Sequence, residues 1–204
     1  IDDFCNYFEP EVLDEFDRLL SYNGIFIART ANVGVVPKEM AIDFGLTGPN
    51  LRGSGVKRDL RKDEPYCIYD RFTFDVPVGS GENGTTGDCW DRYMVRIREM
   101  RQSINIVRQA LAAVPDGSFI DKKASKTVKP PKGEVYHKVE GARGELGFHI
   151  VSDGTAIPYR VKTRGPSFCN ISILDSMTQG GGVMVADVVA IIGSLDIVMG
   201  EVDR

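Results

Sequence analysis

The strongest pattern of apolar and polar positions in the chain predicts one long amphipathic helix, from about Cys89 to Ala113. Asp88 is placed to cap its N-terminus, and Pro115-Asp116-Gly117 follows its end. One face carries apolar residues at helical spacing, namely Trp90, Tyr93, Met94, Ile97, Met100, Ile104, Val107 and Leu111. The other face is rich in arginine, which could contact phosphates but is more typical of a solvated or salt-bridged surface.

Helical spacing also predicts shorter helices before and after this one. They span Glu9–Tyr22, Pro37–Ala41, Asn170–Thr178 and Val183–Ser194. The last of them is strongly apolar, and Gly180–Gly182 before it is expected to act as a flexible joint. The stretch Ile25–Ala28 fits either a short strand or a helical continuation.

Alternating apolar and polar positions predict a three-stranded antiparallel meander in the last third of the chain. Its strands are Glu134–Glu140, Glu145–Val151 and Pro158–Thr163. Tyr66–Tyr69 and Phe72–Val78 alternate like a strand pair or an extended segment, and the polar stretch that follows, Gly79–Gly87, is expected to be a loop.

These elements predict an α+β fold, a helical bundle around the long helix with a small antiparallel sheet. We divide the chain into a mainly helical part (1–121), a lysine-rich connector (122–132) and a part with the sheet, the apolar helix and the tail (133–204), all within one fragment of a larger domain. The 204 residues, 42% hydrophobic and 26% charged, are typical of a soluble protein. Because the chain opens at Ile1, we expect it to begin inside a longer gene product.

Charge and cysteine usage exclude several classes of function. The net charge of -4 argues against nucleic-acid binding by the whole chain, and no apolar run reaches the roughly 18 residues of a membrane span. The cysteines lie far apart without a C-x-x-C pair, as isolated thiols do in a reducing compartment: Cys5, Cys67, Cys89 and Cys169. His137 and His149 could form a metal pair, but no third ligand has suitable spacing, so we predict no metal site.

The segment Gly45–Lys62 is dense in glycine and cations. Backbone N–H groups and these cations could bind an anion or dock a partner, and we assign the docking of a partner subunit to Arg52, Lys57, Arg58 and Arg61. Alternatively, the glycines permit close packing and the cations form a solvated surface. The segment is not a P-loop, because the G-K-[ST] ending is absent.

The C-terminal tail is unusual, because an apolar run beginning near Ala186 ends on charged residues. Chain ends are usually frayed and polar. Charges at a buried terminus are costly unless they pair or face a cavity. In this tail they are Asp196, Glu201, Asp203 and Arg204.

Motifs along nearly the whole chain resemble the carboxy-terminal half of the D-subunit family of respiratory complex I, the proton-pumping NADH:quinone oxidoreductase. They are G-L-T-G-P-N-L-R-G-S-G-V-K-R-D-L-R-K-D-E-P-Y from Gly45, F-D-V-P-V-G from Phe74, D-R-Y-M-V-R-I-R-E-M-R-Q-S from Asp91, P-K-G-E-V-Y from Pro131, G-E-L-G-F-H-I-V-S-D-G from Gly144, P-Y-R-V-K from Pro158 and A-D-V-V-A-I-I-G-S-L-D-I-V-M-G-E-V-D-R from Ala186. The resemblance implies a fold like that of the nickel-iron hydrogenase large subunit, to which that family is related.

The resemblance also gives the tail a function. Hydrogenase large subunits end in D-P-C-x-x-C, whose two thiolates bind the metals; here Val198 and Glu201 stand at the two cysteine positions. Valine cannot ligate nickel, so a hydrogenase-type subunit is disfavoured. A remodelled cavity would suit an apolar quinone ring whose carbonyls need a few polar partners. The implied quinone-pocket residues are Asp196, Val198, Met199, Glu201 and Arg204.

The resemblance further implies that this chain is a subunit of the translocating enzyme and holds no cofactor itself. Quinone is the substrate, and an iron-sulfur cluster, NADH and FMN belong to partner subunits, among them the one with the terminal cluster. The implied location is peripheral, on the cytoplasmic face of the bacterial inner membrane or the matrix face of the mitochondrial one. The isolated chain is expected to be inactive.

Two departures from the family limit these assignments. The segment between the long helix and P-K-G-E-V-Y is shorter than usual, and the amino-terminal half, with the family's quinone-headgroup histidine and tyrosine, is missing. No catalytic residue is therefore assigned, and the choice between ubiquinone and menaquinone stays open. A competing interpretation is that the chain is a docking scaffold without catalytic activity, with its basic segments serving contacts to other subunits.

Overall fold

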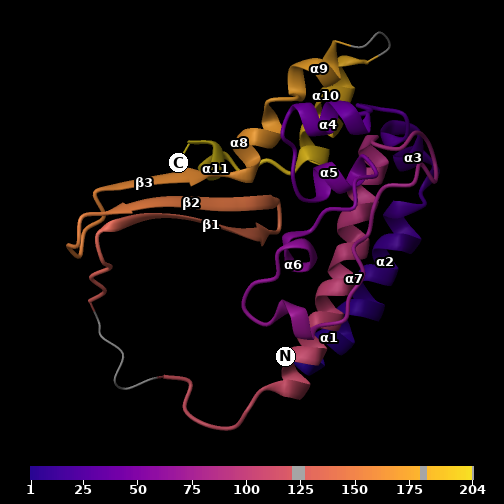
Figure 1. Cartoon of the computed structure of the whole chain (residues 1–204). Coiled ribbons are helices and arrows are strands. Elements are labelled where there is room, and N and C mark those ends of the chain that lie inside the picture. The colour runs from indigo at the N-terminus through magenta and orange to yellow at the C-terminus, as the bar shows by residue number, and fades with distance from the viewer. Residues whose placement is uncertain (121–126, 180–182, 204) are drawn as a thin grey trace.

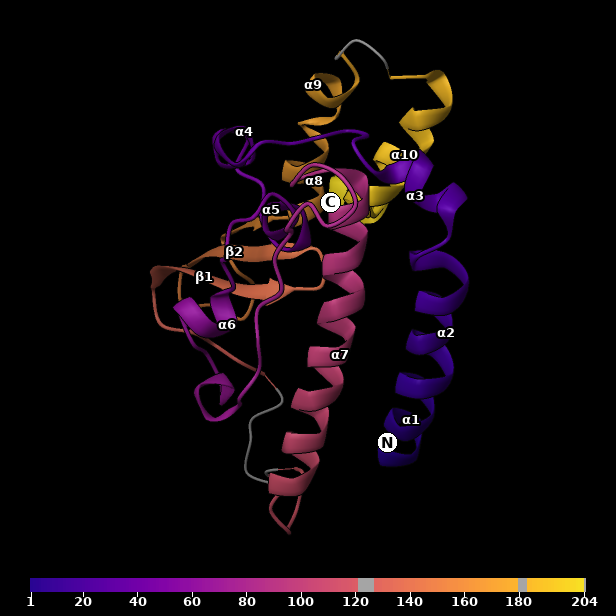
Figure 2. The same cartoon turned by 90° about the vertical axis from the view of Figure 1, so that its right-hand side faces the viewer.

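The long helix α7 (Cys89–Ala113) is the axis of the structure, and Asp88 caps it by accepting a hydrogen bond from Asp91 N at 2.8 Å. The computed structural model describes residues 1–120, 127–179 and 183–203. α7 lies between a helical segment at the N-terminus and a sheet that projects to the other side (Figures 1 and 2). The predicted bounds of this helix are confirmed.

The N-terminal residues 2–21 form one helical segment beside α7 (Figure 2). In it α1 (Asp2–Tyr7) and α2 (Asp14–Phe16) alternate with π-helical stretches, Phe8–Leu13 and Asp17–Ser21. The segment begins earlier than the predicted Glu9, and Pro10 lies inside it. Because proline lacks an N–H group and its ring collides with the carbonyl four residues back, the wider π-helical turn accommodates it.

Short helices occupy most of the next part of the chain: α3 (Gly24–Thr30), α4 (Lys38–Asp43), α5 (Pro49–Gly53) and α6 (Leu60–Asp63). The helical alternative for Ile25–Ala28 is therefore the correct one. Asn23 caps α3 by accepting hydrogen bonds from Ile25 N and Phe26 N. The glycine-rich segment packs tightly, since a Cβ added at Gly48 (φ 66°) would lie 2.4 Å from Gly144 Cα.

The possible strand pair in residues 66–78 does not form; the chain there is a 3₁₀ turn, Tyr69–Arg71, followed by an extended segment. The extended segment runs along α7. Thr73 N donates to Gln109 Oε1 at 2.9 Å, and Asp75 N donates to Gln102 Oε1 at 3.0 Å. Side chains of a helix thus take the place of a partner strand.

The predicted meander is confirmed as an antiparallel sheet in the order β1 (Gly133–Gly141), β2 (Gly144–Ser152), β3 (Arg160–Arg164). His137 pairs with Phe148, and Ile150 pairs with Val161. Of the predicted connector 122–132, residues 122–126 lie outside the described residues, and 127–132 lead into β1.

In the described part of the chain four helices follow the sheet: α8 (Pro166–Ile171), α9 (Leu174–Thr178), α10 (Val185–Leu195) and α11 (Met199–Asp203). Two helices thus replace the single one predicted over residues 170–178. The joint predicted at 180–182 lies outside the described residues. The predicted apolar helix is confirmed as α10, within two residues of its predicted bounds, but it is not the final helix because α11 follows it.

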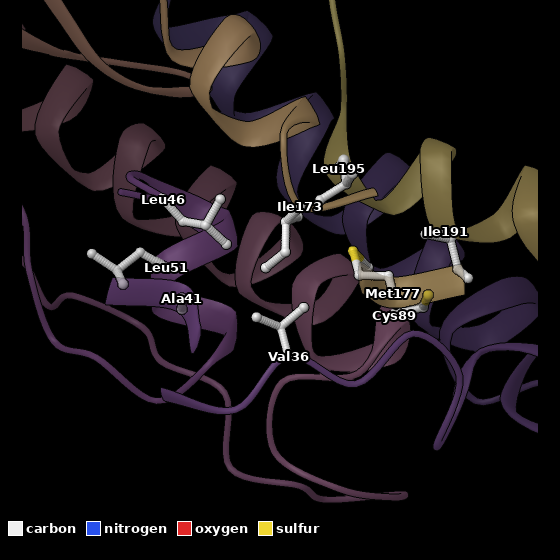
Figure 3. Close-up of a cluster of buried hydrophobic side chains, with 9 residues drawn as sticks. All are labelled: Val36, Ala41, Leu46, Leu51, Cys89, Ile173, Met177, Ile191 and Leu195. Carbon is white, nitrogen blue, oxygen red and sulfur yellow. The ribbon is translucent and has the colours of Figure 1, made fainter. Parts of the chain in front are cut away.

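The main core joins the beginning and the end of the chain around the N-terminus of α7 (Figure 3). Its buried members are Val36, Ala41, Leu46, Leu51, Cys89, Ile173, Met177, Ile191 and Leu195. A smaller cluster of Cys5, Leu13 and Ile104 attaches the N-terminal segment to α7. Because both predicted parts, 1–121 and 133–204, contribute to the main core, they pack as one unit.

Candidate functional site

Arg52 on α5 is the centre of a buried ion network. Its side chain is 1% exposed; its Nε donates to Glu99 on α7 at 2.5 Å, and its Nη1 donates to Glu140 on β1 at 2.8 Å. Glu140 Oε2 also accepts from Leu60 N at 3.1 Å, at the start of α6. One guanidinium therefore links α5 and α7 to the sheet, and Glu140 extends the link to α6.

Burial and ion pairing shift the pKa values of the groups in this network in different directions. Burial lowers the pKa of Arg52, but Glu99 and Glu140 outweigh burial and raise the pKa above its usual value. For Glu99 burial dominates and raises the pKa, although Arg52 opposes the shift. Asp59, which accepts from Arg61 at 2.6 Å, has a lowered pKa because the bonds from Arg61 outweigh burial.

Two arginines of α7 are interior rather than solvated. Arg92 is 1% exposed and donates to Gly34 O at 2.9 Å, Gly87 O at 2.5 Å and Ser194 Oγ on α10 at 3.0 Å. Arg96, one turn further, donates to Asn50 Oδ1 at 3.0 Å. Arg96 follows Tyr93 by three residues and precedes Met100 by four, so it borders the apolar stripe, and that position was a signal that sequence reasoning missed. Arg92 lies outside the stripe and carried no such signal.

Arg96 and Asp196 meet where α10 ends and the tail begins. Arg96 Nε is buried without a hydrogen-bond partner among the described residues, and Asp196 Oδ2 lies 3.8 Å from it. Arg143, in the β1–β2 turn, approaches the other oxygen of Asp196 at 3.4 Å. Burial lowers the pKa of Arg96 to about 10, although Asp196 opposes the shift, so Arg96 stays protonated at neutral pH.

A cavity of about 480 Å³ opens between these groups, within the range of small-molecule sites. Its lining combines three arginines, three carboxylates and apolar atoms: Arg52, Arg61, Arg96, Glu99, Met100, Ser103, Glu140, Gly141, Ala142 and Asp196. It can accommodate a small molecule with an apolar body that exchanges hydrogen bonds at its rim.

The structure separates the predicted quinone-pocket residues. Asp196 lines the large cavity, whereas Met199, 70% exposed, lines a separate depression on α11. Glu201 accepts hydrogen bonds from the N and Oγ of Ser167 on α8, and Val198 N donates to Ser167 Oγ at 3.3 Å. Arg204 lies outside the described residues.

The predicted docking residues also divide. Lys57 and Arg58 are exposed, and Arg58 reaches Glu145 at 3.3 Å. Arg52 is buried, and Arg61 is engaged with Asp59 inside the network. The alternative of a uniformly solvated cationic surface is therefore wrong for Arg52.

A second, mainly apolar cavity of about 260 Å³ lies between α3, α7 and α10. Its lining includes Phe26, Tyr93 and Ala190, and Arg96 lines both cavities. The Arg96 side chain therefore contributes to the walls of a polar cavity and an apolar one.

The histidines lie on the sheet. His149 is 3.3 Å from Glu134, and the His137 ring contacts Tyr66 edge-on. Within the described ranges, no three His, Cys, Asp or Glu side chains come together as metal ligands do, and all four cysteines are free thiols. Among the same residues, every helix is too short or too polar to cross a bilayer.

Comparison with known proteins gives one consistent family. Residues 1–204 match the family described as respiratory-chain NADH dehydrogenase, 49 Kd subunit. The D subunit of NADH-quinone oxidoreductase from Dehalococcoides mccartyi is 53% identical over 96% of this chain and 51% of its own length. The corresponding D subunits of Methylacidiphilum infernorum (99% of this chain, 52% of the relative) and Solibacter usitatus (100% and 53%) are 50% and 48% identical. The chain spans about half the length of these relatives.

Proposed function

This chain belongs to the 49 Kd subunit family of respiratory-chain NADH dehydrogenase, and from that premise we propose that it forms part of the quinone-reduction chamber of NADH:quinone oxidoreductase. The observation that carries the proposal is the 480 Å³ cavity, whose wall includes Asp196 at the start of the tail. Its mixed lining matches what an apolar ring with polar oxygens needs.

In this proposal the tail contributes Asp196 to the chamber wall, and Ser167 holds the tail in place. The hydrogen bonds from Ser167 to Glu201, and from Val198 to Ser167, hold the backbone between α10 and α11. Met199 is exposed in its own depression, where it is free to contact the quinone's apolar tail or a neighbouring subunit. The hydrogenase-like ancestry of the fold belongs to the same proposal and rests on the sequence resemblance.

Electrons reach the quinone from the terminal iron-sulfur cluster of a partner subunit, and NADH and FMN are bound elsewhere in the enzyme. The exposed Lys57 and Arg58 are the residues of the glycine-rich segment best placed to contact that partner, while Arg52 and Arg61 support them from inside. The chain then acts as a peripheral subunit on the cytoplasmic or matrix side of the membrane.

A photoreactive quinone analogue tests the proposal in the assembled enzyme. We expect labelling of the peptide that contains Asp196, competed by excess decylubiquinone. Val198→Phe should weaken quinone or inhibitor binding because it adds volume to the tail, whereas Val135→Phe, at an exposed position of β1 (Val135 is 57% exposed), should not. Absence of competed labelling together with unchanged Val198→Phe kinetics would refute the assignment.

A docking scaffold without catalytic activity is the second candidate, and a surface feature favours it. Large apolar side chains are exposed on neighbouring helices, including Ile25 (78%) on α3 and Val185 (90%) and Val189 (76%) on α10. Such a surface is typical of a protein interface. The labelling experiment separates the candidates, since a scaffold alone predicts no quinone label at the tail.

A further inference from the structure

The junction between α10 and the tail has an unusual backbone conformation. Asp196 follows the last residue of α10 and adopts left-handed angles, φ 54° and ψ 52°. Non-glycine residues are uncommon in this region and persist where surrounding contacts hold them. The carbonyl of Leu195 would lack a helical partner, but the fully buried Asn50 donates to it from Nδ2 at 3.0 Å.

Arg96 holds Asn50 and faces Asp196 at the same time. Its Nη2 donates to Asn50 Oδ1 at 3.0 Å, and its Nη1 donates to Arg92 O at 2.8 Å. Because a guanidinium is a rigid planar fork, fixing both terminal nitrogens also fixes Nε, which lies 3.8 Å from Asp196 Oδ2. Lysine, with a single flexible ammonium group, could not reproduce this arrangement.

Arg143 holds Asp196 from the sheet side. Its Nε donates to Asp196 O at 3.2 Å, and its Nη2 donates to Oδ1 at 3.4 Å. The carboxylate therefore lies between two guanidinium groups from different elements while lining the cavity. A carboxylate at neutral pH accepts hydrogen bonds and donates none.

We infer that Arg96 is a positioning residue that, with Asn50, holds Asp196 as a hydrogen-bond acceptor at the cavity wall and so makes the cavity favour ligands that present a hydroxyl group. The inference rests on the proposed function. A quinone carbonyl accepts hydrogen bonds, whereas each hydroxyl of the reduced quinol can donate one. Asp196 therefore distinguishes the two redox forms, binding the quinol more tightly than the quinone.

Binding of decylubiquinol and decylubiquinone to the assembled enzyme tests this inference. We expect Arg96→Lys to reduce the preference for the quinol by about tenfold, about 1.4 kcal/mol, chiefly through lost quinol affinity. Arg98→Lys is the matched control, because Arg98 lies on the same helix but pairs with Glu82 at the surface. It should leave both affinities unchanged.

A purely structural role for Arg96 predicts a different result. Arg96→Lys would then weaken both ligands equally or neither, and either outcome overturns the inference while quinone binding itself stands. Asp196→Asn provides an independent test that keeps the size of the side chain. This variant should shift the binding preference toward the quinone, because the asparagine amide can donate a hydrogen bond to a quinone carbonyl. An unchanged preference refutes the inference. If Asp196→Ala leaves both affinities intact, the inference fails; the proposed function fails with it only if the competed quinone label is absent as well.

Discussion

The two halves of α7 use arginine in opposite ways. Near the N-terminus of the helix, Arg92 lies in the interior among backbone carbonyls. Further along, Arg101 pairs with Asp17 at 2.8 Å, and Arg108 pairs with Glu9 at 2.6 Å, both at the partly exposed seam with the N-terminal segment. Residue type alone does not decide what an arginine contributes to stability. Its contribution depends on whether the elements packed around it bury the side chain or leave it partly exposed.

The energetic consequence differs as much as the geometry. Interior charges are removed from water and depend on their partners, so losing one partner leaves the others uncompensated. When an ion pair near the surface is broken, water replaces the lost partner, so the cost in stability is small. Removing arginines from the interior should therefore cost more stability than removing those at the seam.

The largest effect is expected for Arg52→Met, which leaves Glu99 and Glu140 facing each other without their shared cation. The free energy of unfolding should fall by about 3–5 kcal/mol. Urea denaturation measures the loss, with the exposed Lys57→Met as control. If Arg52→Met lowered the free energy of unfolding no more than Lys57→Met does, the claim that interior cations matter more for stability than surface cations would be wrong.

Arg92→Met should have the next largest effect. It leaves the carbonyl of Gly34 without its donor, whereas the carbonyl of Gly87 still accepts from Val36 N at 2.9 Å. An unsatisfied buried polar group costs about 1–3 kcal/mol. We expect a loss of about 2–3 kcal/mol in the same assay. A neutral result would mean that water or repacking satisfies the carbonyl of Gly34.

Arg101→Ala should cost about 1 kcal/mol or less, because its ion pairs with Asp14 and Asp17 are partly solvated. The loss should shrink further in high salt, which screens exposed charges. A salt-independent loss of several kcal/mol would show that the seam behaves like the interior.

The smallest effect is a change in pH dependence at Asp59. Its pKa is lowered in the folded chain, so its stabilisation is present above the unfolded-state value of about 3.9 and is lost as pH falls through the folded-state pKa. Urea titrations between about pH 6 and pH 3 should show a shallower acid loss for Asp59→Asn than for the wild type. An identical slope would contradict the lowered pKa.

Sequence reasoning was most accurate where a local pattern is regular. The period of α7, the alternation in the three strands and the apolar run of α10 each predicted an element within a few residues. It left alternatives open where tertiary contacts replace local ones. The extended segment at Thr73 and Asp75 looks like a strand but is hydrogen-bonded to glutamines of α7.

The candidate site shows the same limit. Of the residues predicted for the quinone pocket, Asp196 lines the large cavity, whereas Met199 and Glu201 lie elsewhere, and the pocket itself stays a prediction. Asn50 and Arg96 were missed as partners because they are 46 residues apart in sequence. Spacing along the chain has no information about such a pair.

By itself, the sequence determined the approximate limits of the most regular elements, which are α7, α10 and the three strands, and the family to which the chain belongs, because periodicity and motifs are local. The tertiary structure decided which of many arginines became interior, and it placed Asp196 between Arg96 and Arg143. The physical reason is that burial and charge pairing depend on which helices and strands pack against one another in the folded chain. Arg92 and Arg98 look alike in the sequence, yet one donates to backbone carbonyls in the core and the other to a surface glutamate.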